Sequence, residues 1–231
     1  MTVLSTAQNI ARSTGLAPPS SLVGNTNQDA RRLLQALNDA GRFLSRFEWQ
    51  AQVAEVTISA SGADVYALPS DFRSIVPMTI WKVGTSEPAR GPVRNIEWQA
   101  VKYGTSASGI YDKFHFRWSG VNQRIYINPV PATADTFVYL YRRDGWVVSG
   151  GTTVASCSAD TDTFLLDDYM VECEAKWRFL KSIGQSYGEE KDEAQRIRLI
   201  TQAEDGGMEP IGAGYSDTPF SWNYPERNFG Q

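Results

Sequence analysis

The sequence predicts an α+β protein in which helices from both ends of the chain form one bundle and the residues between them form an antiparallel β domain. Residues 25–49 and 164–184 carry apolar side chains at spacings of three and four, which is typical of amphipathic helices. The intervening residues alternate apolar and polar side chains, as half-buried strands do. Because an amphipathic helix must bury its apolar stripe against another element, we expect the two distant helices to pack together. The predicted units are a bundle of residues 1–49 and 164–205, a β domain of residues 50–163 and an extended C-terminal arm of residues 206–231.

The helix predicted over residues 164–184 is the element around which the bundle is organised. Asp167 and Asp168 stand where an N-cap belongs, and Gly184 stands at the C′ position. Two acid-first pairs four residues apart are expected on its outer faces, Glu172–Lys176 and Glu174–Arg178. Its predicted apolar face consists of Met170, Cys173, Trp177, Leu180 and Gly184.

Three further helices are predicted. The first covers residues 1–15 and is stopped by Gly15. The second covers residues 25–49, with a capping box of Asn25 and Gln28, and the third runs from a capping box of Ser186 and Glu189 to about Asp205. The stripe of the second helix consists of Ala30, Leu33, Leu34, Leu37, Ala40, Gly41, Leu44 and Phe47, and four arginines lie off it, facing solvent or an interface: Arg31, Arg32, Arg42 and Arg46.

The middle of the chain predicts short antiparallel strands. A half-buried strand at residues 54–58 is followed by a turn and a returning strand at residues 65–68, which together predict a hairpin. Residues 75–83 predict a further strand, with Pro77 indicating an edge position or a bulge. The next three strands, residues 113–118, 124–128 and 136–143, are closely spaced with short turns, which predicts antiparallel pairing. A short helix is predicted at residues 96–103 and a long loop containing a short hairpin at residues 145–162.

Composition excludes several classes of function. The chain of 231 residues has a net charge of −4 and no basic tail, which argues against tight gripping of nucleic acid. No segment approaches the ~20 apolar residues of a membrane span, so no membrane is expected. Cys157 and Cys173 are predicted to be reduced thiols, with Cys173 buried on the apolar helix face.

No catalytic, cofactor-binding or metal-binding residue is predicted. His115 is the one histidine, and its place on a strand predicts a solvent-facing side chain rather than a base or ligand. Glycine-rich phosphate loops and zinc spacings are absent from the sequence. The dense aspartates lack the spacing of a calcium loop, and helix capping accounts for the last two of them: Asp160, Asp162, Asp167 and Asp168.

Two alternative functions remain open at this point. A carbohydrate-binding module is suggested by aromatic residues of the β region, Trp81, Trp98, Trp118 and Tyr139. A muralytic, tail-associated enzyme requires two carboxyl groups, which could come from Glu172, Glu174, Glu189, Glu190 and Glu193. Basic residues also recur and either balance nearby acids on a solvated face or line an interface with an acidic partner: Arg31, Arg32, Arg142, Arg143, Lys176, Arg178 and Lys181.

The C-terminal arm is rich in glycine, proline and aromatic residues. It is too irregular to form a core of its own, and a disordered tail is one reading. We favour an arm that docks on a neighbouring subunit or partner, because tryptophan and tyrosine supply most of the anchoring energy in such contacts. The predicted partner-binding residues are Tyr215, Phe220, Trp222, Tyr224 and Phe229.

Three short motifs carry a resemblance to a known group. The heptapeptide Tyr66–Phe72 closes the first hairpin, Ile125–Pro131 ends a strand, and Leu165–Tyr169 leads into a helix. In order and spacing they resemble the head-to-tail adaptor proteins of short-tailed bacteriophages, a group that includes the tail tubular protein A and head-completion adaptors. The resemblance covers residues 25–205.

The resemblance implies a non-enzymatic structural adaptor of the phage neck. Such adaptors form a homo-oligomeric ring, usually of twelve copies, between the portal protein and a tail or nozzle protein. The ring helps to retain and conduct double-stranded DNA, which passes without sequence-specific binding. The bundle then faces the portal and channel, the β domain faces outward or toward the tail, and the arm runs onto the portal. The protein is expected in the virion at the head-to-tail interface, after assembly in the host cytoplasm.

Overall fold

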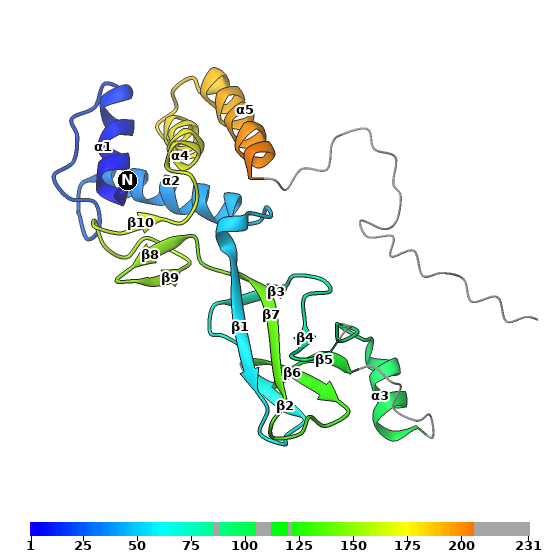
Figure 1. Ribbon diagram of the computed structural model, residues 1–231. Helices are drawn as coiled ribbons and strands as arrows, with labels where there is room; N and C mark the ends of the chain where they lie inside the picture. The colour runs from blue at the N-terminus through cyan, green and yellow to red at the C-terminus, as the bar shows by residue number, and fades with distance from the viewer. Residues whose placement is uncertain (86–87, 105–111, 120–121, 206–231) are drawn as a thin grey trace, which may run out of the picture.

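The computed structural model describes residues 1–85, 88–104, 112–119 and 122–205, which form an α+β structure, as predicted. Four helices gather at one end of the molecule, and most strands lie at the other end (Figure 1). Those helices are α1 (Val3–Ser13), α2 (Gln28–Leu44), α4 (Asp168–Ser182) and α5 (Gly188–Glu204). No helix in the described ranges is long and apolar enough to cross a membrane.

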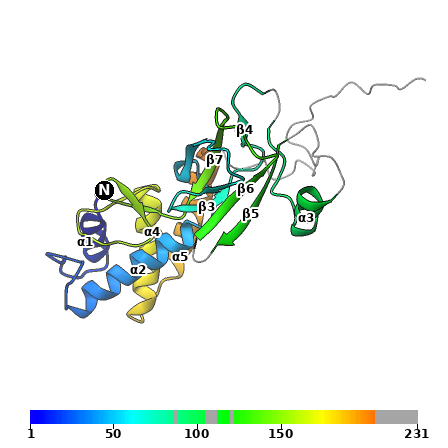
Figure 2. The same ribbon diagram turned by 90° about the horizontal axis from the view of Figure 1, so that it is seen from below.

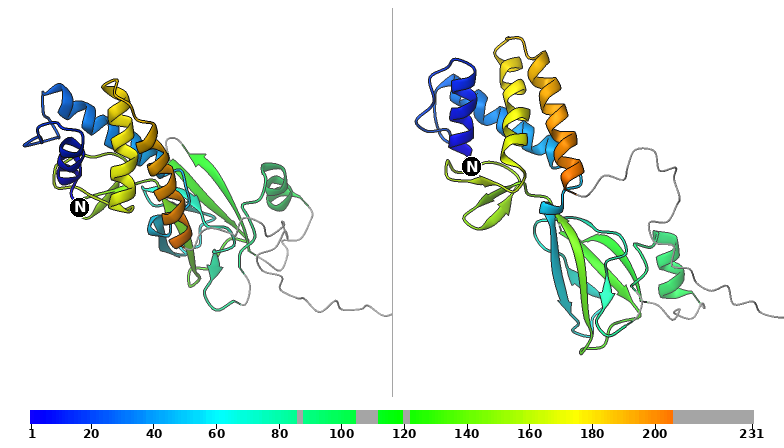
Figure 3. Two further views of the ribbon diagram at one scale, coloured as in Figure 1. Left: turned by 90° about the horizontal axis from the view of Figure 1, so that it is seen from above. Right: turned by 45° about the horizontal axis from the view of Figure 1, so that its top comes forward.

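One hydrophobic cluster joins the helices from both ends of the chain. α4 packs against α1, α2 and α5 (Figure 3). A small sheet of β10 (Thr163–Phe164), β8 (Val147–Ser149) and β9 (Thr152–Val154) lies beneath them, and Trp146 just before it is fully buried. The largest fully buried side chains of this cluster are Ile10, Leu22, Leu33, Leu37, Leu44, Trp146 and Phe179.

The buried face of α4 is wider than predicted and turned relative to the prediction. Met170 and Leu180 are buried as expected, but Cys173 and Trp177 are only half-buried. Trp177 instead packs against Tyr187 at the start of α5, with ring centroids 6.1 Å apart. The face toward α1 and α2 also includes Val171, Ala175 and Phe179, because a central helix with three helical neighbours buries more than one stripe.

The caps of α4 are confirmed, whereas the two predicted capping boxes are wrong. The Asp167 carboxylate accepts from Met170 N at 2.7 Å, and Gly184 has φ +75°. α2 is capped by Asn27, because the side chain of Asn25 is already engaged with Asn27 N at 2.8 Å in the preceding turn. α5 begins after Tyr187 without a side-chain cap. α2 also ends at Leu44 rather than Trp49, and the Trp49 indole donates to its last carbonyl at 2.8 Å.

Two antiparallel sheets enclose a second hydrophobic cluster (Figure 2). The first has the order β1–β7–β3, with β4 also paired to β7, and the second has the order β2–β6–β5. Ile58, Phe137 and Tyr139 enter the cluster from the first sheet, and Phe114 and Ile125 enter it from the second. The strands are β1 (Val53–Ser59), β2 (Val65–Ala67), β3 (Phe72–Ile75), β4 (Trp81–Lys82), β5 (Lys113–Ser119), β6 (Asn122–Asn128) and β7 (Thr136–Arg143).

Strand pairing departs from sequence order. The predicted hairpin of residues 54–68 does not form, because β1 pairs with β7 and β2 pairs with β6. The β5–β6 hairpin and the β8–β9 hairpin in the long loop are confirmed. The strand predicted at residues 75–83 is divided into β3 and β4, with Met78 at φ +60° between them. Helix α3 (Asn95–Tyr103) is confirmed and lies at the end of the molecule remote from the other helices.

The loop before α4 fastens the N-terminal segment. Backbone N–H groups of Leu22 and Val23 donate to the Asp160 carboxylate at 2.8–3.2 Å. Val3 N donates to Asp162 O at 2.8 Å, and the Asp162 carboxylate accepts from Ser158 N at 2.7 Å. These acidic residues therefore organise the loop and fix α1 beside it. No group of acidic, histidine or cysteine residues in the described ranges could hold a metal ion.

Candidate functional site

The described chain ends at the junction between the helices and the larger sheets. Asp205 follows α5, and its Oδ2 accepts from Gln50 N at 2.6 Å. Gln52 Nε2 donates to Gly145 O at 3.2 Å at the same junction, where Arg142 also pairs with Glu48. The predicted partner-binding residues come after this point and lie outside the described residues: Tyr215, Phe220, Trp222, Tyr224 and Phe229.

Two arginines bind the three long helices together. Arg178 Nη2 donates to Glu174 Oε1 at 2.7 Å, and its guanidinium lies 5.0 Å from the ring centroid of Phe43 in α2. Arg198 of α5 lies 5.3 Å from the same ring and 4.8 Å from that of Phe47. The Glu174–Arg178 pair forms as predicted, but Glu174 is only 3% exposed instead of facing solvent. Both guanidiniums therefore pack against aromatic rings where α2, α4 and α5 meet.

Most carboxylates that suggested a muralytic enzyme line a groove between α1, α4 and α5. The cavity measures about 330 Å³, and Glu174 is not part of it. The second predicted ion pair is replaced here, because Lys176 Nζ lies 3.9 Å from Glu190 and Asn9 donates to Glu172. The Arg196 guanidinium lowers the pKa of Glu193, which is opposite to the shift that a general acid requires. The groove is lined by Ser13, Tyr169, Glu172, Cys173, Lys176, Glu189, Glu190 and Glu193.

The aromatic residues that suggested carbohydrate binding do not share one surface. Trp81 is 39% exposed, whereas Tyr139 is buried within the second cluster and Trp98 is buried against His115. The side chain of Trp118 lies outside the described set. The described residues therefore give no open aromatic platform on which a sugar ring could stack.

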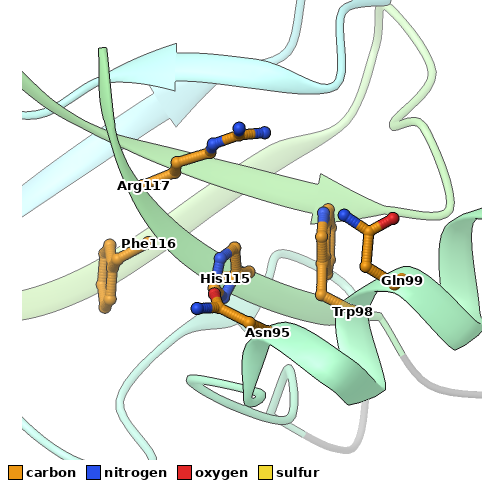
Figure 4. Close-up of a pocket in the computed structure, with 6 residues that line it drawn as sticks. All are labelled: Asn95, Trp98, Gln99, His115, Phe116 and Arg117. Carbon is orange, nitrogen blue, oxygen red and sulfur yellow. The ribbon is translucent and has the colours of Figure 1, made fainter. Parts of the chain in front are cut away.

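A second cavity, of about 490 Å³, lies between α3 and β5 (Figure 4). His115 is 7% exposed at this cavity, so the prediction of a solvent-facing histidine is wrong. α3 covers this face of the strand: Trp98 stacks on the His115 ring with centroids 5.4 Å apart, and its indole meets Tyr126 edge-on at 6.3 Å. His115 Nδ1 is 2.8 Å from the carbonyl oxygen of Val93. The cavity is lined by Asn95, Trp98, Gln99, His115, Phe116 and Arg117.

The position of this cavity could not be predicted from local sequence patterns. The helix over residues 96–103 and the strand over residues 113–118 were both predicted, but nothing local indicated that one covers the other. A partial signal existed in the close spacing of β5 and β6, which places Arg117 opposite Arg124.

Comparison with known proteins identifies the family. A family model described as SU10 adaptor protein matches residues 1–210 of the 231-residue chain. No curated protein matches the chain. The family match agrees with the α+β architecture and confirms the resemblance to head-to-tail adaptors of short-tailed bacteriophages. The chain therefore belongs to the SU10 adaptor protein family, and it is a structural adaptor of a bacteriophage virion.

Proposed function

We propose that this adaptor forms a homo-oligomeric ring, of twelve copies, that joins the portal protein to a tail or nozzle protein. One observation carries the proposal beyond the family: α5 ends at the helix–sheet junction, where Gln50 N binds Asp205. Residues 206–231, with five large aromatic side chains, therefore start from a fixed point on a folded body. Aromatic residues supply most of the energy in protein–protein contacts, so this segment is suited to anchor the adaptor on the portal.

We further propose that the two hydrophobic clusters belong to two domains with different neighbours. The helical cluster, which also includes Trp146, Val147 and Cys157 from the loop that the sequence assigned to the β domain, faces the portal and the channel, and the cluster of the two larger sheets projects toward the tail. A heterologous contact repeated around an axis closes into a ring. The net charge of −4 suits a channel that retains and conducts double-stranded DNA without binding its sequence.

The test uses the full chain and purified portal rings from the same phage. Replacing the five aromatic residues of the arm by alanine, or ending the chain at Asp205, is expected to abolish capture by portal rings in a sedimentation assay. The matched control replaces five polar residues of the same segment by alanine: Ser216, Thr218, Ser221, Asn223 and Asn228. Native mass spectrometry of the captured complex counts the copies. Undiminished capture of both the aromatic variant and the truncated chain would overturn the proposal.

A further inference from the structure

Two arginines stand directly opposite each other on the β5–β6 hairpin. Arg117 and Arg124 are cross-strand partners in the antiparallel register. Side chains in this relationship have Cβ atoms about 5 Å apart, and like charges there are destabilising. Among the residues that the structure describes, neither guanidinium has a carboxylate within 4.0 Å. The free protein therefore keeps an unfavourable pair of positive charges on its surface.

The arginine pair borders the cavity beside α3. Alternation along β5 places His115 and Arg117 on one face, whereas Phe116 points to the other side (Figure 4). His115 pairs with Tyr126 in the register, next to the Arg117–Arg124 pair. Lys113 lies on the same face of β5, two residues from His115 and on the side away from Arg117, and it also has no ion-pair partner in the described ranges. The cavity wall thus continues into a face with three uncompensated cations.

His115 supplies a second polar group without a partner. A backbone carbonyl only accepts hydrogen bonds, so the 2.8 Å contact with Val93 O places the proton on Nδ1. The other ring nitrogen, Nε2, has no hydrogen-bond partner among the described residues, and it is not one of the fully buried unpaired atoms, so it keeps contact with solvent in the cavity. The amides of Asn95 and Gln99 lie at the same cavity and can donate and accept.

We propose that this face, defined by His115, Arg117 and Arg124 with the cavity beside α3, binds an acidic segment of another protein. A carboxylate placed between the two guanidiniums accepts charge-assisted hydrogen bonds from both and removes their mutual repulsion. A neighbouring backbone or side-chain donor of the same segment can bind His115 Nε2. The proposal rests on the proposed function, in which the β domain faces the tail, and it assigns the acidic segment to the tail-side partner.

A protein carboxylate fits this face better than the phosphates of DNA. The uncompensated cations are three, and the chain as a whole is acidic, whereas a DNA-binding face gathers many cations along a stripe. The pocket between Trp98 and Arg117 is recessed and lined by amides, which suits a side chain inserted from a partner. A recess also gives an inserted carboxylate the partial desolvation that strengthens its pairing with arginine.

The single histidine provides a direct readout. His115 ring signals in NMR spectra of the full chain need no assignment, because the sequence contains one histidine. Titration with a blocked hexaglutamate peptide is expected to shift these signals saturably, whereas a hexaglutamine peptide leaves them in place. R117Q and R124Q are each expected to weaken binding at least tenfold while raising the melting temperature slightly. The control R42Q, which removes an exposed arginine of α2, is expected to change neither the affinity for the peptide nor the melting temperature.

Three outcomes would overturn this inference. These are unmoved His115 signals, equal binding by R117Q and the wild type, and tighter binding of a 20-base-pair duplex or of inorganic phosphate with the same dependence on Arg117. Portal capture separates this inference from the proposed function, because R117Q and R124Q are expected to be captured like the wild type. Failure of the peptide titration with intact capture removes this site alone. Failure of capture with intact titration removes the portal role and leaves the site.

Discussion

Gly41 of α2 lies directly against the indole ring of Trp146. A Cβ atom built on Gly41 would stand 2.2–2.3 Å from three ring carbons of Trp146, which is fully buried. Real Cβ atoms essentially never come that close, so the glycine is required by the tryptophan. This contact joins α2 to the chain that leaves β7, and it brings two segments about 100 residues apart in sequence into the same core.

Replacing Gly41 by alanine is expected to destabilise the protein by about 1–3 kcal/mol through overpacking. At an exposed helix position the same substitution increases the stability by about 1 kcal/mol, because alanine has the higher helix propensity. The sign of the change in free energy of unfolding therefore distinguishes overpacking from propensity. Urea unfolding measures the difference. The control is Gly188→Ala at the start of α5, where nothing lies near the new Cβ. Equal responses of the two variants would show that the ring and the helix are not in contact.

Arg178→Met is expected to cost about 3 kcal/mol or more, because it leaves the buried Glu174 carboxylate without its partner. Glu174→Gln should cost less, since Arg178 keeps its contacts with Phe43 and Trp177 and a hydrogen-bond acceptor. Unfolding free energies from denaturant curves test this order.

The matched control for that pair is Arg196→Met. Arg196 also pairs with a glutamate on its own helix, but its side chain is 64% exposed, so solvent screens the pair and little change in the free energy of unfolding is expected. A cost for Arg178→Met no greater than that of Arg196→Met would contradict the buried pair.

Asp162 makes stability sensitive to acid. Burial raises the pKa of its carboxyl, but hydrogen bonds from Ser149, Ser158 and Ala159 outweigh this effect and hold the pKa below its ordinary value. The ionised Asp162 carboxylate therefore makes its full contribution to the free energy of unfolding above the unfolded-state pKa of about 3.9. That contribution is lost as the pH falls through the lower folded-state pKa. Asp162→Asn is expected to lower stability by about 1–3 kcal/mol at pH 7.

Urea unfolding at pH 7 and pH 3 checks this prediction. The difference in free energy of unfolding between the wild type and Asp162→Asn should be smaller at pH 3 than at pH 7. The exposed Asp192→Asn should have the same free energy of unfolding as the wild type at both pH values. A constant gap would mean that the charge of Asp162 makes no contribution.

The two cysteines are free, as predicted, and should differ in reactivity. Desolvation raises the pKa of the buried Cys157 to about 12, with a smaller contribution from Asp162, so almost no thiolate exists at pH 8. Desolvation also raises the pKa of Cys173, but that side chain is half-buried and lines the groove between α1, α4 and α5. Iodoacetamide at pH 8 is expected to modify Cys173 slowly and Cys157 only after denaturation, as mass spectrometry can show.

Faster labelling of Cys157 than of Cys173 in the folded protein would contradict the burial of its loop. Both residues should react alike in guanidinium chloride, which provides the internal control.

Local signals predicted the helices well and the contacts between elements poorly. Asp167 and Gly184 marked the ends of α4 because caps depend on a few neighbouring residues. Cys173 and Trp177 were placed on the core face because one stripe was assumed, whereas α4 has helical neighbours on several sides. His115 was expected in solvent because strand alternation distinguishes two faces but does not show that α3 covers one of them. Pairing of β1 with β7 was missed for the same reason, since alternation identifies faces and not partners.

The fastening of α1 to residues 160–163 has a consequence for biosynthesis. Val3, Leu22 and Val23 find these hydrogen-bond partners only in a loop that is translated about 140 to 160 residues later. At the ribosomal rate of about 5–20 residues per second, the N-terminal segment waits roughly 7–32 s before that loop is synthesised. During this interval the nascent chain exposes the apolar side of α2, because α4 has not yet been synthesised to cover it. Chaperones can therefore bind this apolar surface before the hydrogen bonds that hold the N-terminal segment have formed.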